Sequence, residues 1–174
     1  MFRDCTSLKN ITLPNTVKEI GQYAFQNCGF TSLEIWDSIT KIGQHAFRDC
    51  KSILSIKVPA TVTTINTYAF YGNTSLQHVE FLANTTTVTD RVFLNCSQLK
   101  TIVLGESITK IGTYTFNGTN LSKVYHKSTT EVTFSINSGN TQFTNATKYW
   151  YSETEPATDG NYWHYETNGE VLEW

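Results

Sequence analysis

Four cysteines are the residues of this chain best suited to chemistry, because thiolates bind zinc and pairs of thiols oxidise to disulfides. Zinc thiolates usually come as close pairs such as C-x-x-C, and no such pair occurs in the sequence. The intervals between successive cysteines are 23, 22 and 46 residues, and the last is twice the first. This regularity indicates a repeat rather than a set of ligands, so we expect neither a metal site nor a cofactor. The cysteines are Cys5, Cys28, Cys50 and Cys96.

The histidines are the other potential catalytic groups, and no two of them lie close together in the sequence. No H-x-x-x-H pair, G-x-S-x-G turn or glycine-rich phosphate loop is present. His78 and Glu80 alternate with apolar residues and are expected to point away from a core as a solvated pair. Because nothing supplies a nucleophile, a base and an orienting group together, we expect no enzymatic activity.

A repeat becomes visible when the chain is aligned on phenylalanine. Successive anchors are 23, 22, 23, 23 and 23 residues apart, and apolar residues follow most of them six, nine and eleven positions later. The stretch x-I-x-L-x in each unit alternates apolar and polar residues, which predicts a short strand with one buried face. The stretch A-F-x-x-C is too short for a full helix and is interpreted as one helical turn. The anchors are Phe2, Phe25, Phe47, Phe70, Phe93 and Phe116.

Stacking of the units is required, because a single unit cannot bury its own apolar face, and stacking places equivalent residues above one another. Asn73 takes the cysteine position after Phe70 without any change in the surrounding pattern. Cysteine and asparagine share a modest size and some hydrogen-bonding ability, so we interpret this position as a buried structural ladder. A disulfide stays an alternative, since stacked strands lie about 5 Å apart. The ladder consists of Cys5, Cys28, Cys50, Asn73 and Cys96.

The unit L-K-N-I-T-L-P-N-T-V-K-E-I-G-Q-Y-A-F-Q-N-C, from Leu8 to Cys28, resembles the BspA-like leucine-rich repeats. The resemblance covers residues 2 to about 126, and the aromatic segment from Tyr149 to Tyr165 is similar to the C-terminal tail of several such proteins. It implies a mainly β fold with short helical turns: a right-handed leucine-rich-repeat solenoid of about five and a half 22–23-residue repeats, with a C-terminal cap. It further implies a cell-surface or secreted protein used for adhesion or protein recognition, with no known catalysis.

Two segments follow from the extent of the pattern. We expect residues 1–126 to form the solenoid and residues 127–174 to form a Thr/Ser/Asn-rich connection and an aromatic cap. The cap is expected to include a small hairpin around the turn dipeptides Asp159-Gly160 and Asn168-Gly169. A glycan-binding platform built on the same aromatic side chains is the alternative for the tail. The repeat begins at once after Met1 with no signal peptide, so we expect the chain to be a piece of a longer protein.

The exposed strand face is the expected binding surface, because parallel strands of a solenoid form one continuous face. The charges along it alternate in sign, so no large field of one sign steers a partner. Trp36 stands at the turn after one strand, where it either anchors an interface or packs on a neighbouring turn. The candidate binding residues are Glu34, Trp36, Lys57, His78, Glu80, Lys123, Tyr125 and, in the tail, Trp163.

Charge and hydropathy restrict the class of partner. The net charge is -2, and the basic stripe that marks a nucleic-acid-binding protein is missing, so we expect no nucleic-acid partner. No apolar run approaches the roughly 20 residues of a membrane-spanning helix. We therefore expect a protein ligand, such as a host extracellular or cell-surface protein. A glycan stays the alternative, and a structural spacer without a ligand is the third reading.

Overall fold

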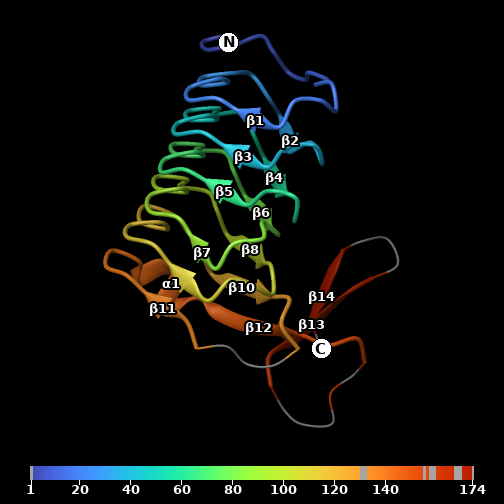
Figure 1. The fold of residues 1–174 in the computed structure, drawn as a ribbon. Coiled ribbons are helices and arrows are strands. Elements are labelled where there is room, and N and C mark those ends of the chain that lie inside the picture. The colour runs from blue at the N-terminus through green and yellow to red at the C-terminus, as the bar shows by residue number, and fades with distance from the viewer. Residues whose placement is uncertain (1, 130–132, 155, 157–159, 167–169, 174) are drawn as a thin grey trace.

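The computed structural model is a stack of short-stranded turns, shown in Figure 1 with the N-terminus at one end and the C-terminal strands at the other. It describes residues 2–129, 133–154, 156, 160–166 and 170–173. The predicted β-solenoid is confirmed, with about six turns. Its eight-stranded sheet is parallel except for the last pair. In spatial order the strands are β14 (Val171–Glu173), β13 (Tyr162–Tyr165), β12 (Thr147–Tyr151), β10 (Lys123–His126), β8 (Thr101–Leu104), β6 (His78–Phe81), β4 (Ser55–Val58) and β2 (Ser32–Glu34).

Two further sheets flank the first, and all their strands except β11 come from the part of each unit that is equivalent to V-x-x-I-G. Their strands are only two residues long, and the second residue is a buried isoleucine or valine in all but β11. The first residue is exposed in each of them except β7, where Thr87 is half-buried. One consists of β1 (Glu19–Ile20), β3 (Lys41–Ile42) and β5 (Thr64–Ile65), and the other of β7 (Thr87–Val88), β9 (Lys110–Ile111) and β11 (Ser135–Ile136).

The core is a column of phenylalanine rings running through the stack. Neighbouring rings lie nearly parallel with centroids 5.3 to 5.9 Å apart, from Phe2 at one end to Phe116. Phe143 continues the column, with its ring 5.3 Å from that of Phe116. Burial of these rings, together with the isoleucines and leucines of the strands, supplies the main stabilisation of a fold whose described residues form no long helix.

The A-F-x-x-C stretch differs from the single helical turn expected from its length. Tyr23 and Asn27, on either side of Phe25, have φ values of 56° and 57°, and the same left-handed pair recurs in the next turns. The Phe25 N–H donates to the Ala46 carbonyl of the following turn at 2.8 Å, rather than back along its own segment. Hydrogen bonds to the next turn therefore alternate with bonds inside the segment, such as Gln26 N–H to the Tyr23 carbonyl at 3.3 Å. Together they offset the cost of the left-handed residues.

The strand ladder continues past residue 126. β12 pairs with β10 in parallel, β11 pairs with β9, and the short helix α1 (Thr141–Asn145) brings Phe143 into the core. β13 and β14 then form an antiparallel pair. The turn expected at Asn168-Gly169 and the Asp159 half of the turn expected at Asp159-Gly160 lie outside the described residues. Within the described part of the chain, no helix has the length and hydropathy needed to cross a membrane.

Candidate interaction surface

The strand face consists of the side chains of β2, β4, β6, β8 and β10 that point out of the solenoid. On its open part Lys57 lies between two carboxylates, with Nζ 3.3 Å from Oε1 of Glu34 and 4.0 Å from Oε2 of Glu80. The strand register requires this row, because Glu34, Lys57 and Glu80 are directly paired positions of β2, β4 and β6. Pairs this exposed contribute little to stability, so the row is a surface feature more than a structural one.

A shallow hollow of about 310 Å³ lies between these charges. It is lined by the charged row, by His78 and by residues of β2 and β4 that include the small side chains Ser32 and Ser55. Burial lowers the pKa of His78 more than nearby Glu80 raises it, so its ring is neutral at pH 7. The ring Nδ1 lies 2.6 Å from the Thr101 hydroxyl, which fixes the ring against the next strand.

The other part of the strand face is covered by the C-terminal hairpin of β13 and β14. The Lys123 Nζ donates to the Glu173 carboxylate at 2.7 Å, and the Tyr125 hydroxyl donates to the same carboxylate. The indole N–H of Trp163 donates to the His126 carbonyl at 3.1 Å, and its side chain is fully buried. Lys123 and Tyr125 point out of the solenoid, as the strand alternation predicts. They hold the hairpin in place there and are not free to contact a partner.

A second, smaller hydrophobic cluster lies under this hairpin. Val103, Tyr125 and Trp163 are buried in it, and the Tyr165 hydroxyl reaches Glu80 at 3.5 Å. The sequence did contain a signal for this cover. Val103 and Tyr125 are large apolar or aromatic residues at outward strand positions, and such positions are buried when another element lies on them.

Trp36 lies half-buried at the edge of the main core. Its ring centroid is 6.3 Å from that of Phe25, and together with Leu13 it lines a separate surface hollow. Packing on the neighbouring turn accounts for most of its surface. Leu54, directly before β4, is half-exposed instead, and the sequence reasoning did not single it out as a contact residue.

The cysteine positions form a hydrogen-bonded ladder. The Cys50 thiol donates to the Phe25 carbonyl at 3.1 Å, and the Asn73 amide donates to the equivalent carbonyl of Phe47 at 3.2 Å. Burial raises the pKa of the Cys50 thiol to about 12, so it is protonated and unreactive at pH 7. The free thiols are Cys5, Cys28, Cys50 and Cys96, of which only Cys5 is exposed.

Two of the other histidines are held by packing and backbone contacts. His126 is buried, where it contacts the Ile108 carbonyl through Nε2 and accepts the Ser128 N–H through Nδ1, which requires the neutral ring. His45 is stacked between Tyr23 and Tyr68. Among the residues that the structure describes, no three His, Cys, Asp or Glu side chains come together as metal ligands would.

The repeat geometry agrees with a comparison against protein-family models. The model described as the BspA type leucine rich repeat region matches residues 18–148 in six copies. The chain belongs to this family. Leucine-rich repeat proteins of this kind are typically non-enzymatic scaffolds for protein interaction. The match extends beyond residue 126, in agreement with the continued strand ladder. No curated protein matched the chain.

Several solved structures share the fold of this BspA-type chain. A leucine-rich repeat protein from Bacteroides ovatus matches with a TM-score of 0.67 at 21% identity, over 86% of this chain and 45% of that one. The T. pallidum leucine rich repeat protein matches with a TM-score of 0.54 at 28% identity, over 61% and 50%. A leucine rich cell surface protein from Faecalibacterium prausnitzii matches with a TM-score of 0.53 at 26% identity, over 89% and 48%. The chain thus spans about half the length of these proteins.

Proposed function

We propose that this chain is a protein-recognition module that contacts its partner through the open part of the strand face, over β2, β4 and β6. The observation that carries the proposal is the hollow lined by Glu34, Lys57 and Glu80. The C-terminal hairpin reaches only its last strand, where the Tyr165 hydroxyl contacts Glu80 at 3.5 Å. Charged side chains held in strand register give a partner fixed points of electrostatic complementarity, which favours specificity and association rate.

A role in adhesion to a host extracellular or cell-surface protein, with the chain displayed on the cell surface, is part of this proposal. It is supported by the family and by the similar structure whose name describes a cell surface protein. The three open strands are only three or four residues long. A standard interface covers about 800 Å² of each partner, so residues outside the strands, such as half-exposed Leu54, must contribute contacts.

Charge reversal on the strand face tests the proposal. The chain is immobilised and its binding to a panel of purified host extracellular-matrix and cell-surface proteins is measured by biolayer interferometry. For any protein that binds, Lys57→Glu is expected to weaken the affinity about tenfold, because it places three carboxylates in a row. Lys110→Glu on β9, an exposed lysine of a different sheet, is the matched control and is expected to bind like the wild type.

Two results would count against this assignment. Equal binding by the wild type and Lys57→Glu would remove the open strand face from the interface, and equal weakening by both variants would point to a general charge effect. The absence of any bound protein would favour the third reading, in which the chain is a structural spacer without a ligand.

The alternative of a glycan- or cell-wall-binding platform on the aromatic tail is less well supported. Such a platform needs exposed ring faces, because sugars stack on the faces of aromatic side chains. Trp163 is fully buried and Trp150 keeps only 9% of its surface exposed, with its ring packed against His126 and Phe134. These contacts favour a packing role for both indoles.

A further inference from the structure

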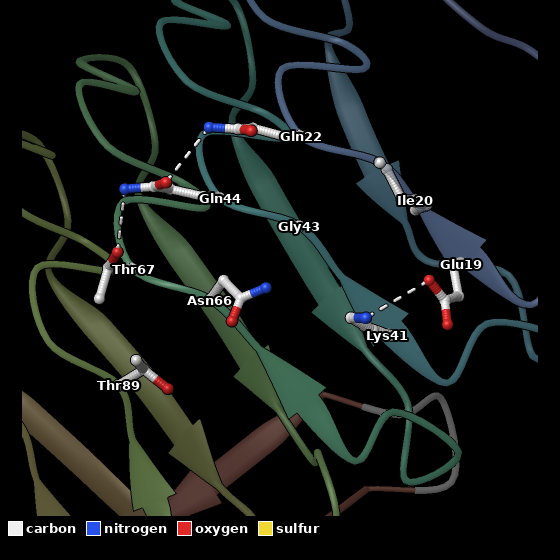
Figure 2. Close-up of a pocket in the computed structure, with 10 residues that line it drawn as sticks. Glu19, Ile20, Gln22, Lys41, Gly43, Gln44, Asn66, Thr67 and Thr89 are labelled. Atoms are coloured by element: carbon white, nitrogen blue, oxygen red, sulfur yellow. Dashed lines mark hydrogen bonds and ion pairs between the residues drawn. The ribbon is translucent and has the colours of Figure 1, made fainter.

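A second depression lies on the sheet formed by β1, β3 and β5, which is separate from the eight-stranded sheet of the strand face. It has a volume of about 510 Å³ and crosses the strands along the direction of stacking (Figure 2). Each turn contributes equivalent positions to it, so its polar groups recur at the strand spacing of about 5 Å. We call this depression the polar groove.

One wall of the polar groove is a ladder of amide and hydroxyl side chains. The Gln22 Nε2 donates to Gln44 Oε1 at 3.2 Å, and the Gln44 Nε2 donates to the Thr67 hydroxyl at 3.4 Å, as Figure 2 shows. Each side-chain amide carries two N–H donors and two acceptor lone pairs. The ladder therefore orients these groups while leaving each of them able to hydrogen-bond a ligand as well.

The floor of the polar groove is open because of a close approach between turns. A Cβ at Gly43 would lie 2.7 Å from the Gln22 backbone nitrogen, so a side chain at this position would clash with the preceding turn. Asn66 occupies the equivalent position of the next turn, and Figure 2 shows its side chain between the amide ladder and Lys41. Among the described residues, the Asn66 side-chain amide has no hydrogen-bond partner.

The charges at the polar groove cancel. The Lys41 Nζ lies 3.5 Å from Oε2 of Glu19, and these are the charged side chains that line the groove. A phosphorylated or strongly acidic ligand would need an excess of cationic groups, which this lining does not offer. The chemistry of the groove is that of neutral donors and acceptors.

We propose that the polar groove binds a neutral oligosaccharide chain, at a site independent of the strand face. Amides and hydroxyls both donate and accept, as the hydroxyl groups of a sugar do, and an extended glycan can meet one such group per turn. A peptide suits the groove less well. It cannot add as a strand, because the groove runs across β1, β3 and β5, whose backbone groups are already paired with one another.

Side-chain amide resonances give a direct test. Uniformly 15N-labelled protein is titrated with linear neutral hexasaccharides of glucose, mannose, xylose and N-acetylglucosamine at millimolar concentrations. A charged galacturonate hexasaccharide and a Gly-Ser decapeptide are titrated in parallel. At least one neutral sugar is expected to shift the side-chain N–H signals of Gln22, Gln44 and Asn66 in a saturable manner. The backbone signals of Lys57 and His78 on the strand face should stay in place.

The decisive variant is Asn66→Leu, which removes the amide at nearly constant volume and breaks no hydrogen bond of the ladder. It is expected to weaken the affinity for that sugar about threefold to tenfold, as expected for the loss of one hydrogen bond between protein and sugar. Asn117→Leu, at an equally half-buried asparagine outside the groove, is the matched control and should bind like the wild type. Thermal unfolding of both variants checks that the fold is intact.

Three outcomes would overturn the proposal. These are the absence of saturable shifts with every neutral sugar, stronger binding of the galacturonate or the peptide than of any neutral sugar, and equal affinity of Asn66→Leu and the wild type. Because Lys57→Glu lies on another sheet, that variant should retain full sugar binding, which separates this site from the proposed protein interface.

Discussion

The carboxylate of Glu173 holds the C-terminal hairpin on the strand face, and Glu173→Gln tests how much this contact contributes. Its ion pair with Lys123 is partly solvated, with 42% of the lysine and 29% of the glutamate side chain exposed, so it is worth at most about 1 kcal/mol. The hydrogen bond from Tyr125 to a charged acceptor adds about 1.5 kcal/mol. Glutamine keeps some hydrogen bonding, so we expect the free energy of hairpin docking to become about 1–2 kcal/mol less favourable.

Native-state hydrogen exchange is the suitable assay, because it separates local opening from global unfolding. In Glu173→Gln the amides of β13 and β14 should exchange about fivefold to thirtyfold faster, whereas those of β4 and β6 should keep their rates. Lys110→Glu serves as the charge-change control. Unchanged exchange in β13 and β14, or an equal increase in all strands, would refute the conclusion that this contact anchors the hairpin.

The same contact predicts a pH dependence. Burial alone would raise the pKa of Glu173, but the hydrogen bonds from Lys123 and Tyr125 outweigh it and lower the pKa below the ordinary value of 4.5. A carboxylate with a lowered pKa stabilises the docked state above its unfolded pKa, and this stabilisation is lost as the pH falls through the lowered value. Docking of the wild-type hairpin should therefore weaken below pH 4.5, and docking of Glu173→Gln should respond less.

Three further predictions concern the solenoid. Phe70→Ala, in the middle of the ring column, should lower the free energy of unfolding in urea by about 3–5 kcal/mol. Phe2→Ala should lower it much less, because Phe2 is 40% exposed at the end of the column. Equal losses in the two variants would contradict the column. In the native protein a thiol reagent should label Cys5 but not Cys96, because burial raises the pKa of the Cys96 thiol to about 12. Labelling of all four thiols at one rate would contradict the buried cysteine ladder. Burial lowers the pKa of His126 from 6.5, so the unfolded chain binds the proton first and stability falls below pH 6.5. His126→Gln should flatten the dependence of Tm on pH in that range, and an unaltered slope would assign the effect to other groups.

The two halves of the strand face have different consequences for a binding partner. The hairpin removes the outer surface of β8 and β10 from contact, and only the part over β2, β4 and β6 is left open. A variant with a weakened hairpin would expose Val103 and Tyr125 as an additional apolar patch. Any gain of binding in Glu173→Gln would then show that the hairpin competes with a ligand for this surface.

Much of the fold could be predicted because the repeat is local. The period of 22–23 residues, the inward isoleucines and leucines and the shared role of Asn73 and the cysteines follow from positions within one unit. The last turn was harder to see, because Phe143 follows Phe116 by 27 residues and the insertion hides its place in the column. The left-handed turn around each phenylalanine was also missed, since every second N–H of the segment donates to the next turn, and one unit of sequence does not show that partner.

The sequence by itself determined the stack: which residues face inward, how often the unit recurs and which family it resembles, because strand alternation and stacking act over a few residues and one period. Only the tertiary structure decided which part of the outward face is open. The contacts that cover it join residues far apart, 50 positions between Lys123 and Glu173 and 85 between Glu80 and Tyr165. No periodicity encodes such contacts, since they depend on where the tail returns after the repeat has ended.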